Sequence, residues 1–270
     1  MIESPNDTVL VNLDDHLLTI TLNRPTALNA LNYDMNYALN QITKSIIDHS
    51  EVRVIIIRGA GDHFMAGGDL KSFKAKSDAE PDRVAFSAQF QELVLEAQKP
   101  IRLLRRMRQP VLASVHGSAA GYGFSLMNAC DMVIAADNAV FTIAYSRIGV
   151  SPDGGSTWTL PRIVGYRRAF ELMALSDRFD AETALRFGLV NNVVDLSILD
   201  VETTKLARQL ASGSAYAIGN TKELLSRSSR LDLEEQLSAE TVSFVDCASQ
   251  PDFEEGLTAF IEKRPAQFNR

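Results

Sequence analysis

Two segments rich in glycine and alanine, each placed after a short apolar run, constrain this chain most strongly. The runs 52–57 and 111–115 are β-branched and almost wholly apolar, which is typical of strands buried on both faces of a sheet. The segments 64–70 and 117–125 follow them. Small residues allow close backbone approach, so each segment is able to turn amide groups into a cavity. The alternative is that these glycines only serve tight turns and packing.

Strand and helix patterns alternate around these two segments. The alternation from Val9 to Leu22, interrupted at Asp14-Asp15, predicts a hairpin. Apolar residues at helical spacing predict helices over 27–48 and 82–108. Two further strands are expected at 132–135 and 140–143. The pattern therefore predicts an α/β protein.

The pattern becomes purely helical near residue 200. We therefore divide the chain into an α/β core over 1–199 and a helical C-terminal region over 200–270. The apolar spacing within that region predicts four helices, at 201–211, 216–226, 233–247 and 253–263. The apolar faces of these four helices must pack against another surface.

Charge and composition exclude several classes of protein. The net charge of −7 argues against broad nucleic-acid binding, because phosphate affinity needs clustered positive charge. No apolar stretch approaches the ~18 to 20 residues of a membrane span, and the first residues do not resemble a signal peptide. Cys130 and Cys247 are too isolated for a disulfide framework or a zinc site. We expect a cytoplasmic protein with no metal.

Taken together, the motifs resemble the crotonase superfamily of enoyl-CoA hydratases and isomerases along nearly the whole chain. The matching stretches occur in the family's order and spacing, and they are 22–30, 64–70, 110–123, 130–131, 151–162 and 182–190. The resemblance implies the ClpP/crotonase-like spiral of β-β-α turns, followed by a helical trimerisation region. It also implies an acyl-coenzyme A thioester as substrate, and no redox or metal cofactor.

The same resemblance implies the residues of the site. The backbone amides of Gly68 and Tyr122 would bind the thioester oxygen, and one donor of this kind is worth ~3 to 4 kcal/mol. The segments around them would contact the rest of the substrate, and the residues concerned are Ala27, Leu28, Ala30, Ala66, Asp69, Leu70, Gly121 and Tyr145. An oxyanion hole of this kind stabilises an enolate, but it does not by itself select a reaction.

The chain departs from the hydratase pattern at the two positions where hydratases of the family carry glutamates. Ser125 stands at the first position and Tyr145 at the second. Neither is a carboxylate base near neutral pH, since a tyrosine has an ordinary pKa of about 10. Ordinary enoyl-CoA hydration is therefore disfavoured. Tyr145 is expected to form a wall of the acyl pocket, although its hydroxyl has the reach to orient Asp153 or the substrate.

Asp153 is the candidate acid and base. Local sequence also fits a turn or helix-capping role after Pro152. Isomerases of the superfamily place their working aspartate here, and 152–162 resembles the 1,2-epoxyphenylacetyl-CoA isomerase branch. We therefore expect an isomerase that shifts a double bond, or opens an activated ring, in an enoyl- or aryl-acetyl-CoA. Hydration of an unusual enoyl-CoA and acyl-CoA binding without catalysis remain open.

The C-terminal tail and Asp131 carry the remaining expectations about binding and structure. Phe260 and Lys263 resemble the C-terminal motif that contacts the nucleotide end of coenzyme A, often across a subunit boundary, although Lys263 also fits a solvated helix. The helical tail would then form a homotrimer or a dimer of trimers. Asp131 is expected to brace backbone, and no nucleic-acid or membrane partner is expected.

Overall fold

The computed structural model describes residues 2–47 and 49–268, and two β-sheets form its framework. The larger sheet consists, in spatial order, of β1 (Val9–Asp14), β2 (Leu17–Leu22), β3 (Val54–Gly59), β4 (Val111–Val115), β6 (Met132–Ala136) and β9 (Asn192–Val194). The smaller sheet consists of β5 (Ser118–Ala120), β7 (Val140–Thr142) and β8 (Phe179–Asp180). β1 and β2 pair antiparallel across the predicted turn, and the remaining neighbours in the larger sheet pair in parallel.

Helices connect these strands and then continue alone to the C-terminal end of the described chain. The helices of the first part are α1 (Tyr33–Ile46), α2 (Leu70–Ala79), α3 (Arg83–Arg106), α4 (Tyr122–Ala129), α5 (Ser156–Val164), α6 (Tyr166–Leu175) and α7 (Ala181–Arg186). Those of the second part are α8 (Leu199–Ala211), α9 (Ala215–Ser228), α10 (Leu233–Ala248) and α11 (Pro251–Glu262). The four predicted C-terminal helices are confirmed, and none of their ends shifts by more than two residues.

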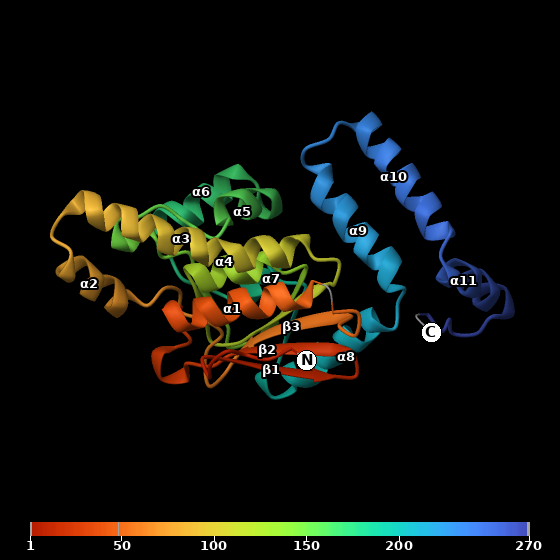
Figure 1. Cartoon of the computed structure of the whole chain (residues 1–270), viewed down its shortest axis with the longest axis horizontal. Coiled ribbons are helices and arrows are strands. Elements are labelled where there is room, and N and C mark those ends of the chain that lie inside the picture. Colours follow the sequence, from red (N-terminus) through yellow and green to blue (C-terminus); the bar gives the residue numbers. More distant parts are fainter. Residues whose placement is uncertain (1, 48, 269–270) are drawn as a thin grey trace.

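The central strands β3, β4 and β6 of the larger sheet are buried on both faces, as their apolar sequences predict. Alternate residues of β3 point to opposite sides: Ile55 and Ile57 join the core beneath α1 and α3, whereas Val54 and Ile56 pack with Leu199 and other residues of α8. Figure 1 shows α1 and α3 on one side of β1 to β3 and α8 toward the other. The loops at the strand ends are therefore held by a rigid support.

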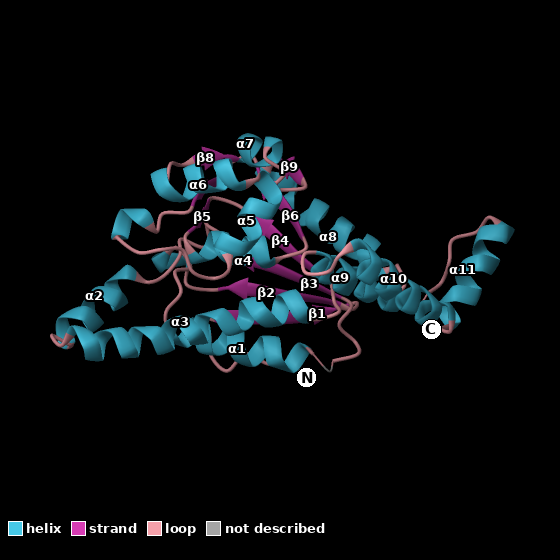
Figure 2. Ribbon diagram, turned by 90° about the horizontal axis from the view of Figure 1, so that it is seen from above, coloured by secondary structure: helices cyan, strands magenta, loops and turns pink. Residues whose placement is uncertain are grey.

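The helices after α8 extend away from this core. Figures 1 and 2 show α9, α10 and α11 leading away from the sheet, whereas α8 lies against it. α10 buries none of its residues, and Phe260 on α11 is 86% exposed. None of the helices in the described ranges is long and apolar enough to cross a lipid bilayer. Helix α8 shares a core with the sheet, although it belongs almost wholly to the predicted C-terminal region. The division of the chain near residue 200 therefore stays a prediction.

Two predicted elements begin later than the sequence pattern indicated. The helix expected over 27–48 begins only at Tyr33, because Leu28 and Asn29 are left-handed and Asn32 caps the helix by accepting from the Met35 amide. Its expected end at Asp48 lies outside the described residues. The strand expected from Val52 begins at Val54. The Val52 amide donates instead to the His49 carbonyl in a turn that precedes the strand.

A buried lysine ties α9 to the sheet. Lys222 Nζ lies 2.6 Å from Asp131 Oδ2 and donates to the Leu104 and Gln109 carbonyls, each at 2.9 Å. The same Asp131 oxygen accepts from the Val111 amide at 2.8 Å, so the expectation that Asp131 braces backbone is confirmed. Burial lowers the pKa of Lys222, and the Asp131 charge opposes that shift. This ion pair is therefore a structural bond between α9 and β4.

Replacing Lys222 with methionine leaves the Asp131 charge without its cation and the Leu104 and Gln109 carbonyls without the lysine donor, although the Val111 amide still donates to Asp131. Breaking a buried pair in this way is expected to lower the free energy of unfolding by about 3–5 kcal/mol, measured by urea denaturation. Lys205→Met is the control, because Lys205 pairs with Glu202 at the exposed surface. Equal effects of the two substitutions would contradict the structural role of Lys222.

Candidate active site

The two glycine-containing segments lie side by side. The Met65 amide donates to the Ser118 carbonyl at 2.9 Å, and the Ala120 amide donates to the Met65 carbonyl at 2.9 Å. Helix α4 then packs so tightly on the first segment that a Cβ at Gly123 would lie 2.2 Å from the Met65 oxygen. Only glycine fits position 123 without a shift of the backbone.

Two backbone amides face this junction without a partner. The Leu31 carbonyl accepts from the Asp69 amide, and the Leu31 amide donates to the Gly67 carbonyl. Since the groups on either side of Gly68 bond toward Leu31, the Gly68 amide points away from Leu31. The Tyr122 amide opens α4, and a Cβ on Gly67 would lie 3.6 Å from its nitrogen. Within the described residues, neither amide has a hydrogen-bond acceptor. Paired free donors at a helix N-terminus can stabilise a developing oxyanion.

Gly121 sets the direction of the second amide. Its φ of 50° and ψ of −119° are accessible to glycine and strained for other residues. Its own amide donates to the Thr142 carbonyl at 3.1 Å, which anchors it to β7. The chain can therefore turn sharply from β5 into α4 and leave the Tyr122 amide facing the junction.

A hydrogen-bonded cluster surrounds Asp153 beside α4. The Tyr145 hydroxyl donates to Asp153 Oδ1, and the Ser125 hydroxyl donates to the Asp153 carbonyl at 3.0 Å. Ser125 Oγ also lies 3.2 Å from the Tyr145 hydroxyl and 2.6 Å from Ser156 Oγ. A Cβ on Gly154 would lie 3.5 Å from the Tyr122 ring. The structure thus brings Ser125, Tyr145 and Asp153 together beside α4, the helix that opens with the Tyr122 amide.

Burial and hydrogen bonding act in opposite directions on the Asp153 carboxyl. Burial raises the pKa of Asp153, and the hydrogen bond from Tyr145 works against that rise. Burial also raises the pKa of the Tyr145 phenol, and the neighbouring Asp153 charge raises it further. Tyr145 is therefore a permanent donor, and Asp153 is the group in this pair that can accept and release a proton.

The loop before α1 lies along the first glycine segment. The Ala66 amide donates to the Leu28 carbonyl at 2.9 Å, and Leu28 and Leu70 are 44% and 51% exposed. Asn29 fixes this loop by donating from its side chain to the Ala60 carbonyl at 2.9 Å. The predicted substrate contacts Ala27, Leu28, Ala30, Ala66 and Leu70 therefore come from adjoining backbone segments.

Asp69 has structural partners. Its carboxylate caps α2 by accepting from the Ser72 amide at 3.1 Å, and it pairs with Arg24 at 3.0 Å. Burial alone would raise the pKa of Asp69, but Ser72 and Arg24 lower it overall. Asp69 thus links the loop before α1 to the start of α2.

An aromatic cluster that the motifs did not reveal packs against the first amide. A Cβ on Gly68 would lie 2.7 Å from the Phe73 ring. Phe73 meets Phe90 edge to face at 5.1 Å, and Phe90 stacks on Phe86 at 5.4 Å. These rings come from α2 and α3, whose path could not be derived from the sequence. The spacing of Phe86 and Phe90, four residues apart, was the available signal.

Two of the predicted substrate-binding residues, Phe260 and Lys263, lie far from the other site residues within one chain. Phe260 and Lys263 are at the end of α11, and Figure 1 shows α11 and α2 at opposite ends of the molecule. A single chain therefore does not bring these residues to the free amides. Across residues 2–47 and 49–268, no group of three or more histidine, cysteine, aspartate or glutamate side chains is arranged to hold a metal ion.

Comparison with known proteins matches this geometry to one family. The family model described as enoyl-CoA hydratase/isomerase matches residues 13–270. A crotonyl-CoA hydratase from Syntrophomonas wolfei is 35% identical, covering 97% of this chain and 98% of the relative. A 1,2-epoxyphenylacetyl-CoA isomerase from Escherichia coli is 34% identical, covering 96% and 97%.

A solved structure shows the same architecture. The enoyl-CoA hydratase from Polaromonas sp. JS666 superposes with a TM-score of 0.89 at 34% identity, covering 97% of this chain and 99% of that one. The comparisons include both hydratases and isomerases. This chain therefore belongs to the enoyl-CoA hydratase/isomerase family and has the crotonase fold.

Proposed function

We propose that this protein is an acyl-CoA isomerase that uses Asp153 as its single acid and base. The observation that carries the proposal is the cluster beside the free amides of Gly68 and Tyr122. Among the residues that the structure describes, Asp153 is the only carboxylate in that cluster, and Tyr145 and Ser125 hold it by hydrogen bonds. A single carboxylate suffices to move a proton between two carbons.

The reaction would proceed through an enolate. The thioester oxygen accepts hydrogen bonds from the Gly68 and Tyr122 amides, which makes the proton on the α-carbon of a 3-enoyl-CoA more acidic. The Asp153 carboxylate takes that proton, and the electron pair moves onto the thioester oxygen. The protonated Asp153 then returns the proton to the γ-carbon, and the double bond shifts to the 2-position. The same enolate chemistry suits an activated ring next to the thioester. No metal or redox cofactor is required.

The remainder of the acyl-CoA would lie along the exposed backbone segments. The loop residues Ala27, Leu28 and Ala30, together with Ala66, offer small side chains and backbone groups to the pantetheine and adenine. Leu70 and Gly121 border the thioester. Phe260 and Lys263 would reach the nucleotide end from a neighbouring copy in a trimer or dimer of trimers, because one chain holds them far from the site.

The aromatic cluster favours an acyl group with a flat ring. Phe73 lies against Gly68, where the thioester would be held, and Phe90 meets Phe73 edge to face. Aromatic rings in these orientations contribute about 0.5–1.5 kcal/mol beyond the burial of their area. An aryl-acetyl group would extend this cluster by one more ring.

Two other functions make different predictions in labelled solvent. Hydration of an atypical enoyl-CoA by Asp153 alone would incorporate solvent oxygen into the product. Acyl-CoA binding without catalysis would give tight binding with no exchange of α or γ protons. The hydrogen bond from Tyr145 to Asp153 favours isomerisation, because it occupies one carboxylate oxygen that would otherwise be free to hold water.

Asp153→Asn removes the base and keeps the shape of the side chain. We expect the rate of double-bond shift in 3-enoyl-CoA to fall about 10²- to 10⁴-fold, with little change in the Kd for acyl-CoA. Mass spectrometry in D₂O follows both the shift and the exchange. Asp177→Asn is the control, since Asp177 is an exposed partner of Arg147. Wild-type activity in Asp153→Asn, or addition of water to the substrate by the wild-type protein, would contradict the proposed isomerase activity of Asp153.

Tyr145→Phe removes the hydrogen bond that opposes the rise in the pKa of Asp153. The pKa of Asp153 should therefore rise further, and the acidic limb of kcat/KM against pH should move to higher pH. Tyr216→Phe is the matched control, because it breaks a hydroxyl–carboxylate bond to Asp246 on the outer helices. An unmoved limb in Tyr145→Phe would show that Tyr145 does not set the protonation of Asp153.

Phe73→Leu tests the aromatic wall. The ratio of kcat/KM for an aryl-acetyl-type substrate to that for a straight-chain enoyl-CoA should fall about 2- to 12-fold, the equivalent of one aromatic pair. Phe170→Leu, on the exposed face of α6, should leave the ratio unchanged. A ratio that rises in Phe73→Leu would show that this ring excludes aryl groups.

A further inference from the structure

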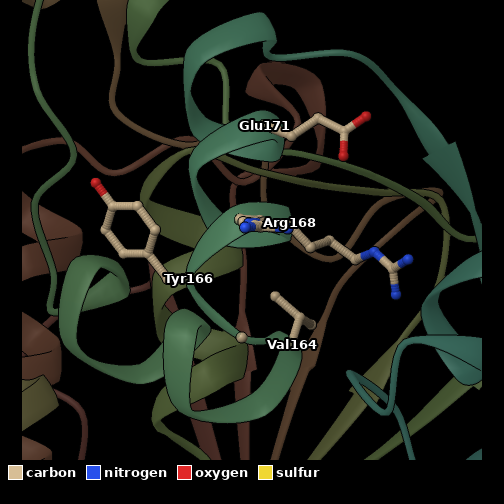
Figure 3. A pocket seen from close by; sticks show the side chains of 6 residues that line it. Val164, Tyr166, Arg168 and Glu171 are labelled. Carbon is tan, nitrogen blue, oxygen red and sulfur yellow. The ribbon is translucent and has the colours of Figure 1, made fainter.

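The hollow at the junction of α5 and α6 does not gather its side chains around a ligand. Its lining residues come from the single segment 164–171. Figure 3 shows the side chains of Tyr166 and Arg168 pointing away from each other. Arg168 lies over the Phe187 ring at 4.1 Å, so its guanidinium is engaged there. We therefore assign no ligand to this hollow.

The side chain of His63 connects the two glycine-containing segments. His63 comes directly before the first of them, and its Nδ1 lies 3.1 Å from the amide nitrogen of Ser118, the first residue of β5. A backbone amide can only donate, so Nδ1 is the acceptor and carries no proton. The imidazole of His63 is therefore neutral in this contact, with its proton on Nε2.

This contact replaces a bond that a regular parallel ladder would form. The Met65 amide donates to the Ser118 carbonyl, and the Met65 carbonyl accepts from the Ala120 amide, each at 2.9 Å. Two residues earlier in such a ladder, the His63 carbonyl would accept from the Ser118 amide. That carbonyl instead accepts from Asn29 Nδ2 at 2.7 Å. The imidazole of His63 thus takes the place of its own carbonyl.

The imidazole packs tightly against the start of the second segment. A Cβ on Gly117 would lie 2.6 Å from His63 Nδ1, and φ at Gly117 is 54°. Only glycine fits this position without a shift of its neighbours. His63 therefore lies where three segments meet. Its carbonyl holds the loop before α1 through Asn29, and its imidazole holds β5.

We propose that His63 is a positioning residue for the two free amides. β5 leads through Gly121 into the Tyr122 amide, and the segment that begins next to His63 carries the Gly68 amide. A bond between the two segments fixes the separation of these donors, and a misplacement of about 1 Å costs about 10²-fold in rate. This role rests on the proposed binding of the thioester oxygen by the same amides.

Two substitutions separate the hydrogen bond of His63 from its bulk. His63→Leu fills the space without an acceptor, whereas His63→Asn keeps an acceptor oxygen on Cγ, the atom to which Nδ1 is bonded in histidine. We expect kcat for the double-bond shift to fall about 10- to 100-fold in His63→Leu, with little change in KM. In His63→Asn, kcat should return to near the wild-type value. His63→Gln, whose acceptor lies one bond farther out, takes the place of the leucine variant if that variant does not fold.

His16→Leu is the matched control. It also removes an imidazole contact, because His16 Nδ1 lies 2.9 Å from the Glu51 carbonyl. His16 belongs to the turn between β1 and β2 and has no contact with either glycine-containing segment among the hydrogen bonds of the described residues. Its kcat should equal that of the wild type.

Two further measurements do not depend on turnover. Hydrogen–deuterium exchange resolved to the Ser118 amide should be about 2- to 12-fold faster in His63→Leu, as expected for one lost hydrogen bond, and normal in His63→Asn. Hexanoyl-CoA labelled with ¹³C at its carbonyl has no double bond to shift. Its infrared carbonyl band should move to lower frequency on binding to the wild type and His63→Asn, and should move less in His63→Leu, because the two donors no longer face one oxygen.

The outcomes distinguish the role of His63 from the proposed function. A carbonyl band that does not move in the wild type would refute thioester binding by the two amides, and the role of His63 with it. A wild-type protein that moves the band but shifts no double bond would refute the isomerase and leave the role of His63 in place. An equal band shift in the wild type and His63→Leu, an unchanged kcat in His63→Leu, or no recovery in His63→Asn would overturn the role of His63 alone.

Discussion

The close contact between the two glycine-containing segments is the constraint on which the active site depends. Met65 bridges the segments through its amide and its carbonyl, and Gly123 lets α4 approach that carbonyl. This contact places the Gly68 and Tyr122 amides side by side and leaves both unpaired. A larger residue at position 123 would separate the segments, and the two donors would no longer face one oxygen. The buried central strands beneath them keep this arrangement rigid.

The second constraint is the balance of forces on Asp153. Burial makes its charged form costly, whereas the Tyr145 hydroxyl stabilises that form. A carboxylate in such a balance can take up and release a proton without being fixed in either state. Ser125 and Tyr145 support Asp153 by hydrogen bonds to its carbonyl and its carboxylate. The proposed isomerase chemistry depends on this single supported carboxylate.

Much of this arrangement could be predicted from the sequence, because its signals are local. Apolar runs such as 111–115 predict the buried strands, which the structure confirms, and the motif positions predict the roles proposed for Gly68, Tyr122 and Asp153. The start of α1 could not be predicted, since Leu28 and Asn29 adopt left-handed conformations that apolar periodicity does not register. The Phe73 and Phe90 contact joins two helices, so only the folded chain reveals it. The bond from the Ser118 amide to His63 likewise depends on the neighbours that the fold supplies.

In the proposed reaction, two backbone amides and one carboxylate act on the same acyl group. A crystal structure with the non-reactive amide analogue of a 3-enoyl-CoA, which keeps the carbonyl oxygen, would test this arrangement most directly. We expect the carbonyl oxygen about 2.7–3.1 Å from the Gly68 and Tyr122 nitrogens. We also expect an Asp153 carboxylate oxygen within hydrogen-bonding reach of the α- and γ-carbons. An acyl group bound outside that junction, or turned so that Asp153 reaches neither carbon, would contradict the proposed mechanism.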